Sequence, residues 1–191
     1  MKITVFATLA LIAGGTVQGK SRPVPYQADV VVCIPVGGVS IDTVLRARVI
    51  TTRIYARIGV TVAWETELSA CPSEGIRIDI NSETPASLKP GALAYALPYE
   101  GNHICVFFDR IAADPDSDRV AVVLAHVFAH EIGHVLQGIS RHSLSGIMQA
   151  HWSRRDFARM KTHSLEFEAD DIQLIYLGLQ QRRAAAAAMV R

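Results

Sequence analysis

Apolar and polar residues follow one another in strand-like patterns along the first half of the chain. Residues 29–35 form a run rich in valine and isoleucine that ends at a proline, which predicts a buried strand. Residues 60–64 and 76–80 alternate apolar with polar or small residues, and residues 103–108 form a further apolar run. These four segments are expected to be β-strands.

Residues 91–97 predict a strand of another kind. The segment is small and apolar, and prolines at positions 90 and 98 bracket it. Proline lacks a backbone N–H and is tolerated at the edge of a sheet but not in a central strand. We therefore expect an edge strand here.

A helical spacing of apolar residues appears in residues 41–58, where arginines lie between the apolar positions. Ser40 is placed to cap the beginning of this helix, and Gly59 is placed to end it. An amphipathic helix lying on the sheet is expected.

The second half of the chain predicts three further helices. A polar loop over residues 109–118 leads into a long apolar helix over residues 119–137. Gly138 follows it, and glycine adopts the left-handed backbone conformation that turns a chain sharply after a helix. Residues 154–161 and 168–183 are expected to form two helices that close the domain.

Length and composition favour one compact domain. Half of the 191 residues are apolar, enough for one substantial core. We assign this domain to residues 20–191, with its core at about 28–183 and a helix-prone, alanine-rich tail at 184–191. The net charge of +1 comes from acids and bases spread along the chain, which argues against nucleic acid as a partner, and a monomer is expected.

The first 19 residues have the order of a secretory signal. Lys2 precedes an apolar run that ends in small, flexible residues, and the run is short for a membrane span. No later segment was expected to be apolar for long enough to cross a membrane. The predicted mature protein is therefore secreted or periplasmic, without stable membrane insertion.

Three cysteines remain, Cys33, Cys71 and Cys105. In an oxidising compartment two of them could pair while one stays free, and the sequence does not choose the pair. None has the spacing of a zinc-binding Cys-x-x-Cys motif.

The long apolar helix carries the sequence His130-Glu131-Ile132-Gly133-His134. His130 and His134 lie one helical turn apart on one face, so both imidazoles can reach one zinc ion. Glu131 points off that axis toward a metal-bound water, as a general base would. Two histidines and a glutamate are costly to bury without such partners, which argues against a chance match.

A catalytic zinc needs a third protein ligand and one open position. His142 is the first choice, because the turn at Gly138 returns the chain toward the metal. His126 lies on the same helical face but about 12 Å from His134 along the axis, so both cannot bind one ion. The remaining alternatives, all beyond the turn, are Glu166, Glu168, His151 and His163.

Residues 130–148, HEIGHVLQGISRHSLSGIM, resemble the metzincin clan of zinc metallopeptidases. The clan has an extended zinc-binding motif followed by a Met-turn beneath the metal, and Met148 matches that methionine. The resemblance implies an α+β domain: a mixed twisted sheet with an edge strand over the cleft, an active-site helix and C-terminal helices.

The chain departs from the metzincin spacing in one place. In the clan the glycine follows the second histidine by three residues and the third ligand by six, whereas here Gly138 follows by four and His142 by eight. Ser140 occupies the expected ligand position, and a serine hydroxyl is a poor zinc ligand.

The resemblance implies a zinc-dependent endopeptidase with one Zn²⁺ per chain and a peptide or protein substrate. The edge strand would hold an extended peptide as an added strand, through the backbone of Leu93, Ala94, Tyr95 and Ala96. Glu131 would take a proton from the zinc-bound water and return one to the leaving amine.

Two other functions stay open at this point. One is a gluzincin-like peptidase with Glu166 or Glu168 as the third ligand. The other is a zinc-containing binding module without catalysis, although closed structural zinc sites are usually rich in cysteine and Glu131 would have no purpose there.

Overall fold

The computed structural model describes residues 28–35, 37, 39–86, 91–96, 101–113 and 117–189. The expected signal, the prolines at positions 90 and 98 and the last residue of the expected edge strand lie outside the described residues.

Five strands form one mixed sheet in the order β2-β1-β3-β5-β4. The first four are mutually parallel, and β4 pairs antiparallel with β5 at the edge. The sequence had predicted each of these strands, including the edge position of β4. Their bounds are β1 Val30–Cys33, β2 Val62–Glu65, β3 Ile76–Asn81, β4 Ala94–Ala96 and β5 His103–Phe107.

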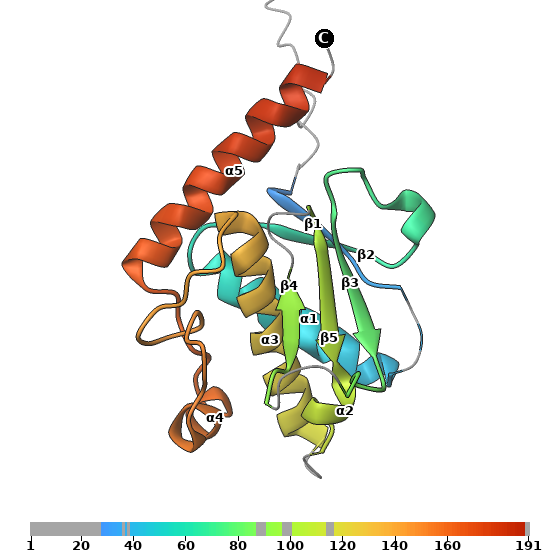
Figure 1. Ribbon diagram of the computed structural model, residues 1–191, viewed down its shortest axis with the longest axis vertical. Coiled ribbons are helices and arrows are strands. Elements are labelled where there is room, and N and C mark those ends of the chain that lie inside the picture. Colours follow the sequence, from blue (N-terminus) through green and yellow to red (C-terminus); the bar gives the residue numbers. More distant parts are fainter. Residues whose placement is uncertain are drawn as a thin grey trace, which may run out of the picture.

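Two helices, α1 (Ile41–Ala56) and α3 (Ser117–Gln137), pack against each other behind the sheet (Figure 1). The alternation in β3 shows why: Ile76 and Ile78 are buried, whereas Arg77 is exposed. One face of the sheet is thus apolar and needs a cover of helices. The domain is α+β, as predicted.

The other helices are α2 (Phe108–Ile111), α4 (Arg154–Met160), α5 (Ala169–Met189) and a short 3₁₀ helix at Leu68–Ala70. Figure 1 shows α5 crossing beside α3 and continuing away from the sheet, with α4 at the opposite end of the molecule. The alanine-rich tail continues α5 as far as Met189.

Two local predictions were wrong. The expected polar loop at 109–118 begins with the single turn α2, because Ile111 is buried in the core and draws that turn inward. Ser40 precedes α1, but its side chain makes no capping hydrogen bond. The buried face of α1, not a side-chain cap, therefore stabilises its beginning.

The segment Asp118–Gln137 of α3 is long and apolar enough to cross a membrane, which corrects the expectation that no such segment follows residue 19. In the structure, however, 94% of its apolar window is buried inside the protein. Its composition is that of a core helix.

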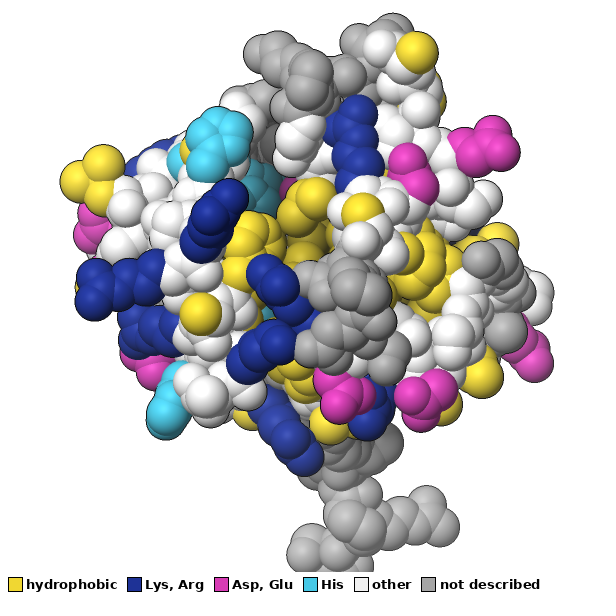
Figure 2. All heavy atoms as spheres, turned by 90° about the horizontal axis from the view of Figure 1, so that it is seen from below, with side chains coloured by type: hydrophobic (Ala, Val, Ile, Leu, Met, Phe, Trp, Pro, Cys, Tyr) yellow, Lys and Arg dark blue, Asp and Glu magenta, His cyan; other side chains and the backbone are white. Residues whose placement is uncertain are grey.

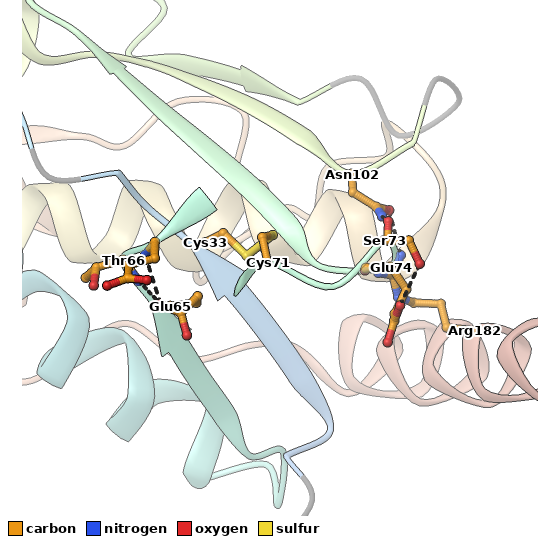
Figure 3. The surroundings of a disulfide bond; sticks show 9 residues. Cys33, Glu65, Thr66, Cys71, Ser73, Glu74, Asn102 and Arg182 are labelled. Atoms are coloured by element: carbon orange, nitrogen blue, oxygen red, sulfur yellow. Dashed lines mark hydrogen bonds between the residues drawn. A yellow bond between two sulfur atoms is a disulfide. The ribbon is translucent and has the colours of Figure 1, made fainter. Parts of the chain in front are cut away.

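A disulfide joins Cys33, at the end of β1, to Cys71, in the loop between the 3₁₀ helix and β3 (Figure 3). Arg182 of α5 reaches the same loop region: it donates to the Asn102 side chain at 3.0 Å and to the carbonyl oxygen of Glu74. The free cysteine, Cys105, is buried in β5. Folding thus made the choice of pair that the sequence left open.

Candidate metal centre

Helix α3 places His130 and His134 side by side, with their Nε2 atoms 3.0 Å apart. Each Nδ1 faces a backbone carbonyl, that of Ile147 at 2.8 Å for His130 and that of Ile139 at 3.1 Å for His134. A carbonyl only accepts hydrogen bonds, so Nδ1 carries the proton in each ring and Nε2 keeps its lone pair. Both lone pairs are thereby held toward one point.

His142 completes the group. The chain leaves α3 at Gly138, whose φ of 67° gives the left-handed turn that the sequence predicted. The return brings Nε2 of His142 to 3.3 Å from Nε2 of His134. The ligand atoms of His130, His134 and His142 all lie within 4.8 Å of one another.

The other residues weighed as the third ligand lie elsewhere. Glu166 is exposed and faces Arg57 of the α1 end at 4.0 Å. Glu168 accepts a hydrogen bond from Ser145. Neither belongs to the three-histidine group.

His126 is a core residue. Its Nδ1 donates to the carbonyl oxygen of Val122 at 2.8 Å, and its Nε2 accepts from the backbone N–H of Leu165 at 3.1 Å. With both nitrogens engaged, it has no lone pair for a metal. Burial lowers its pKa to about 4, which keeps the ring neutral.

Two further histidines and a serine had been weighed beyond the turn. His151 and Ser140 line the cleft beside the histidine group, and both are exposed. His163 lies past α4 and is exposed as well.

Glu131 lies in the same cleft and is buried, with 7% of its surface exposed. Burial raises the pKa of its carboxyl to about 8, and a hydrogen bond from the backbone N–H of Ala96 opposes this shift. The carboxyl therefore lies between the histidine group and the edge strand.

Met148 packs directly beneath the motif helix. A Cβ atom built on Gly133 would lie 2.7 Å from Sδ of Met148, closer than real contacts allow. The glycine inside the motif therefore leaves room for the methionine sulfur. The structure places Met148 where the resemblance put it, below the two helical histidines.

A cleft of about 490 Å³ opens beside the histidine group. The outer edge of β4 forms one wall, and Trp152 and Phe157 belong to the other. Seen from below (Figure 2), this end of the molecule is hollowed, hydrophobic side chains line the hollow, histidine side chains lie beside it, and Lys and Arg side chains surround its mouth.

Only alternate residues of the edge strand face the cleft with their backbone groups. The N–H of Phe107 donates to the carbonyl oxygen of Leu93 at 2.9 Å, so Leu93 and, two residues on, Tyr95 pair with β5. Ala94 and Ala96 point their N–H and C=O groups the other way. Of the four residues predicted to bind substrate, these two have outward backbone groups.

Trp152 is part of the cleft wall, one of the two placements expected for it. Its ring meets that of His130 edge-on, with centroids 5.7 Å apart. Its indole N–H points to the carbonyl oxygen of Gly146 at 3.4 Å, so it is turned toward the loop.

Comparison with known proteins points to one kind of fold. No protein-family model matches the sequence, and no curated protein matches it. Among solved structures, archaemetzincin from Methanopyrus kandleri is similar over 79% of this chain and 96% of its own, at 18% identity and a TM-score of 0.52. A zinc-dependent peptidase from Methanocorpusculum labreanum is similar over 76% and 99%, at 12% identity and a TM-score of 0.52. The fold is that of a zinc metallopeptidase.

The histidine group of this chain fits the ion that such a fold implies. Bonds of about 2.0 to 2.1 Å in tetrahedral geometry separate two ligand nitrogens by roughly 3.3 Å. The Nε2 separations of 3.0 and 3.3 Å are close to that value. Three neutral imidazoles are also the donor set of known catalytic zinc sites.

One side chain next to the site gave no signal in the sequence. Asp171 is completely buried and accepts hydrogen bonds from both neighbours of His142, Arg141 and Ser143. In the sequence it is one of several acidic residues at the start of a helix, where acids are common.

Proposed function

We propose that this protein is a zinc-dependent endopeptidase. The observation that carries the proposal is the convergence of the Nε2 atoms of His130, His134 and His142 beside the buried carboxyl of Glu131, in a cleft bordered by an open strand edge. These are the three parts that metal-assisted peptide hydrolysis requires: a metal site, a base and a place for an extended chain.

The three histidines would hold one zinc ion and leave its fourth position open. Bound there, zinc would polarise the scissile carbonyl and acidify the attacking water. Among the described residues, His142 serves better as the third ligand than Glu166 or Glu168, since those side chains face elsewhere. This geometry favours the metzincin-like reading over the gluzincin-like alternative.

Glu131 would act as the general base and then as the acid. Its carboxyl takes a proton from the attacking water and passes a proton to the amine that leaves. The high pKa of Glu131 in the metal-free protein reflects burial, and a nearby cation lowers the pKa of a carboxyl. The bound metal would thus bring Glu131 to its ionised, basic form.

The substrate would be a peptide in extended form. The outward N–H and C=O groups of Ala94 can pair with its backbone as with a sixth strand, and Ala96 offers its carbonyl oxygen. The apolar part of the cleft, at Leu93, Val127 and Phe157, would receive an apolar side chain next to the scissile bond.

No tyrosine assists at the oxyanion in this proposal. The first tyrosine after Met148 is Tyr176, and its hydroxyl donates to the carbonyl oxygen of Ile58, on the far side of α3 from the cleft. Transition-state stabilisation would rest on the metal.

We further propose that the mature protein works outside the cytoplasm as a monomer. The disulfide between Cys33 and Cys71 supports an oxidising compartment, since such bonds persist there. The signal-like first 19 residues agree with export.

The Glu131→Gln variant tests this function. The amide keeps the size of the side chain but cannot accept a proton, so peptide cleavage should fall by about 10² to 10⁴-fold while zinc content stays near one per chain. The measurements are elemental analysis and cleavage of a broad peptide library by the purified mature protein.

Two results would decide against the proposal. A parent protein that binds zinc but cleaves nothing in the library would favour the non-enzymatic binding module. Full zinc occupancy in His142→Ala would remove His142 from the ligand set.

A further inference from the structure

The loop that carries His142 is attached to a single buried carboxylate. Arg141 donates to Oδ1 of Asp171 at 2.9 Å, and Ser143 donates to the same oxygen at 2.7 Å. The two residues flank His142 in the sequence. Their shared acceptor therefore restrains the peptide units on both sides of the ligand.

Asp171 is suited to this role because it is fully buried. Its side chain is 0% exposed, and its second oxygen accepts from the backbone N–H of Glu168 at 3.2 Å. A buried carboxylate is costly unless its oxygens are paired, so releasing Arg141 or Ser143 would expose this cost. The loop is accordingly held in one position relative to α5.

His142 depends on such an anchor more than its two partners do. His130 and His134 are buried on α3, where the helix backbone fixes them, whereas His142 is exposed and follows a non-helical return. The return contains two more residues before the ligand than the metzincin motif has. A longer return has more conformations to lose when the third bond to the metal forms.

We propose that Asp171 is a positioning residue for the metal centre: it holds the His142 loop through Arg141 and Ser143, so that the last helix of the fold sets the affinity for zinc. The proposal rests on the zinc site of the proposed function. It makes no claim on the chemistry at Glu131, and Asp171 itself touches neither metal nor substrate.

A matched control lies next to it in the chain. Asp170 also approaches Arg141, with 3.5 Å between Oδ2 and Nη2, but its side chain is 78% exposed. An exposed ion pair contributes little. The pair of variants Asp171→Ala and Asp170→Ala thus makes the same substitution in the same helical turn, against the same arginine.

The experiment is a zinc competition titration with a chromogenic chelator on the purified full-length mature protein. Asp171→Ala should lower zinc affinity about 10- to 100-fold, the usual effect of losing a group that orients a ligand. Asp170→Ala should change it less than about threefold. Thermal unfolding of each metal-free variant checks that it is folded, and Asp171→Asn replaces Asp171→Ala where the alanine variant does not fold.

A double variant separates positioning from a general structural role. Once His142 is alanine, the loop no longer supplies a ligand, so Asp171→Ala/His142→Ala should bind zinc as tightly as His142→Ala alone. An equal loss of affinity in both backgrounds would overturn the proposal, as would a folded Asp171 variant that binds zinc like the parent.

The outcome is distinct from a failure of the proposed function. A parent protein that binds no zinc would overturn both proposals. A parent that binds zinc, with unchanged binding in the Asp171 variant, would overturn the positioning role alone.

Discussion

Buried histidines and a buried glutamate respond to pH in opposite directions in this protein. Burial lowers the pKa of His126, His130 and His134 from 6.5 to about 4. Below pH 6.5 the unfolded chain takes up protons that the folded chain refuses, so these residues stabilise the fold less as the pH falls toward 4. Glu131 has a raised pKa of about 8, so the folded chain keeps a proton that the unfolded chain releases above about pH 4.5.

The metal-free protein should therefore be most stable near pH 6.5. Acidification to pH 4 should lower the free energy of unfolding, because three histidines outweigh one glutamate. Between pH 6.5 and 8 the histidines no longer titrate, and Glu131 alone should lower stability by about 1.4 kcal/mol per pH unit at most. Urea unfolding of chelator-treated protein at several pH values measures both arms.

The Glu131→Gln variant isolates the alkaline arm. The amide does not titrate, so its unfolding free energy should stay level from pH 6.5 to 8 while that of the parent declines. A decline of the same size in both proteins would contradict the assignment of that arm to Glu131.

At the scale of elements, the edge strand and the last helix frame the cleft. Strand β4 exposes the backbone groups of Ala94 toward the cleft, whereas Tyr95 pairs with β5. Helix α5 approaches α3 closely enough that a Cβ on Gly178 would lie 1.6 Å from the carbonyl oxygen of Leu136. The first arrangement concerns substrate binding and the second concerns stability.

Proline substitution in β4 should separate substrate binding from folding. Ala94→Pro removes an N–H that points away from the sheet, which an edge strand tolerates, so folding and zinc content should persist while KM for an extended peptide rises several-fold. Tyr95→Pro removes an N–H that bonds to β5 and should lower the melting temperature instead. Steady-state kinetics and thermal melts of both variants make the comparison, and an unchanged KM in Ala94→Pro would argue against strand addition at this edge.

Glycine at position 178 should be needed for α5 to dock. Gly178→Ala places a methyl group against backbone, which cannot give way as a side-chain end can, and should cost more than about 2 kcal/mol. Gly37→Ala is the control, since no atom lies within 4 Å of the added Cβ, and should change stability by less than about 0.5 kcal/mol. Urea unfolding of the two variants would refute the close approach if both behaved alike.

At the scale of the whole molecule, the disulfide links two parts of the fold that are 38 residues apart in sequence. The loop that it closes contains all of α1 and β2. It also lies beside the loop that Arg182 of α5 holds through Glu74 and Asn102 (Figure 3). The sheet and the last helix are thus tied together at the end away from the metal centre.

Removing the disulfide should destabilise the protein without removing the metal site. A closed loop of this length restricts the unfolded chain by about 4 kcal/mol, so the double variant Cys33→Ala/Cys71→Ala should unfold at clearly lower urea concentration. Its zinc stoichiometry should match that of the parent. A variant that lost zinc at full folding would show that the disulfide acts on the site as well.

The sequence alone determined the features that arise within one element. The spacing of His130 and His134 places both on one turn of a helix wherever that helix lies, and the residue at position 138 ends the helix because glycine accepts the left-handed turn. The alternation of apolar residues likewise predicted the strands, because a strand directs successive side chains to opposite faces. Such features depend on neighbours within a few residues.

Tertiary structure decided the features that join distant segments. The third histidine was a choice among several residues in the sequence, and the path of the loop after Gly138, attached to Asp171 of α5, brings His142 to the other two. The pairing of Cys33 with Cys71 and the outward direction of Ala94 depend in the same way on which strands lie side by side. No local pattern encodes these contacts, because each forms only when the long-range packing of sheet and helices has fixed the distance between its partners.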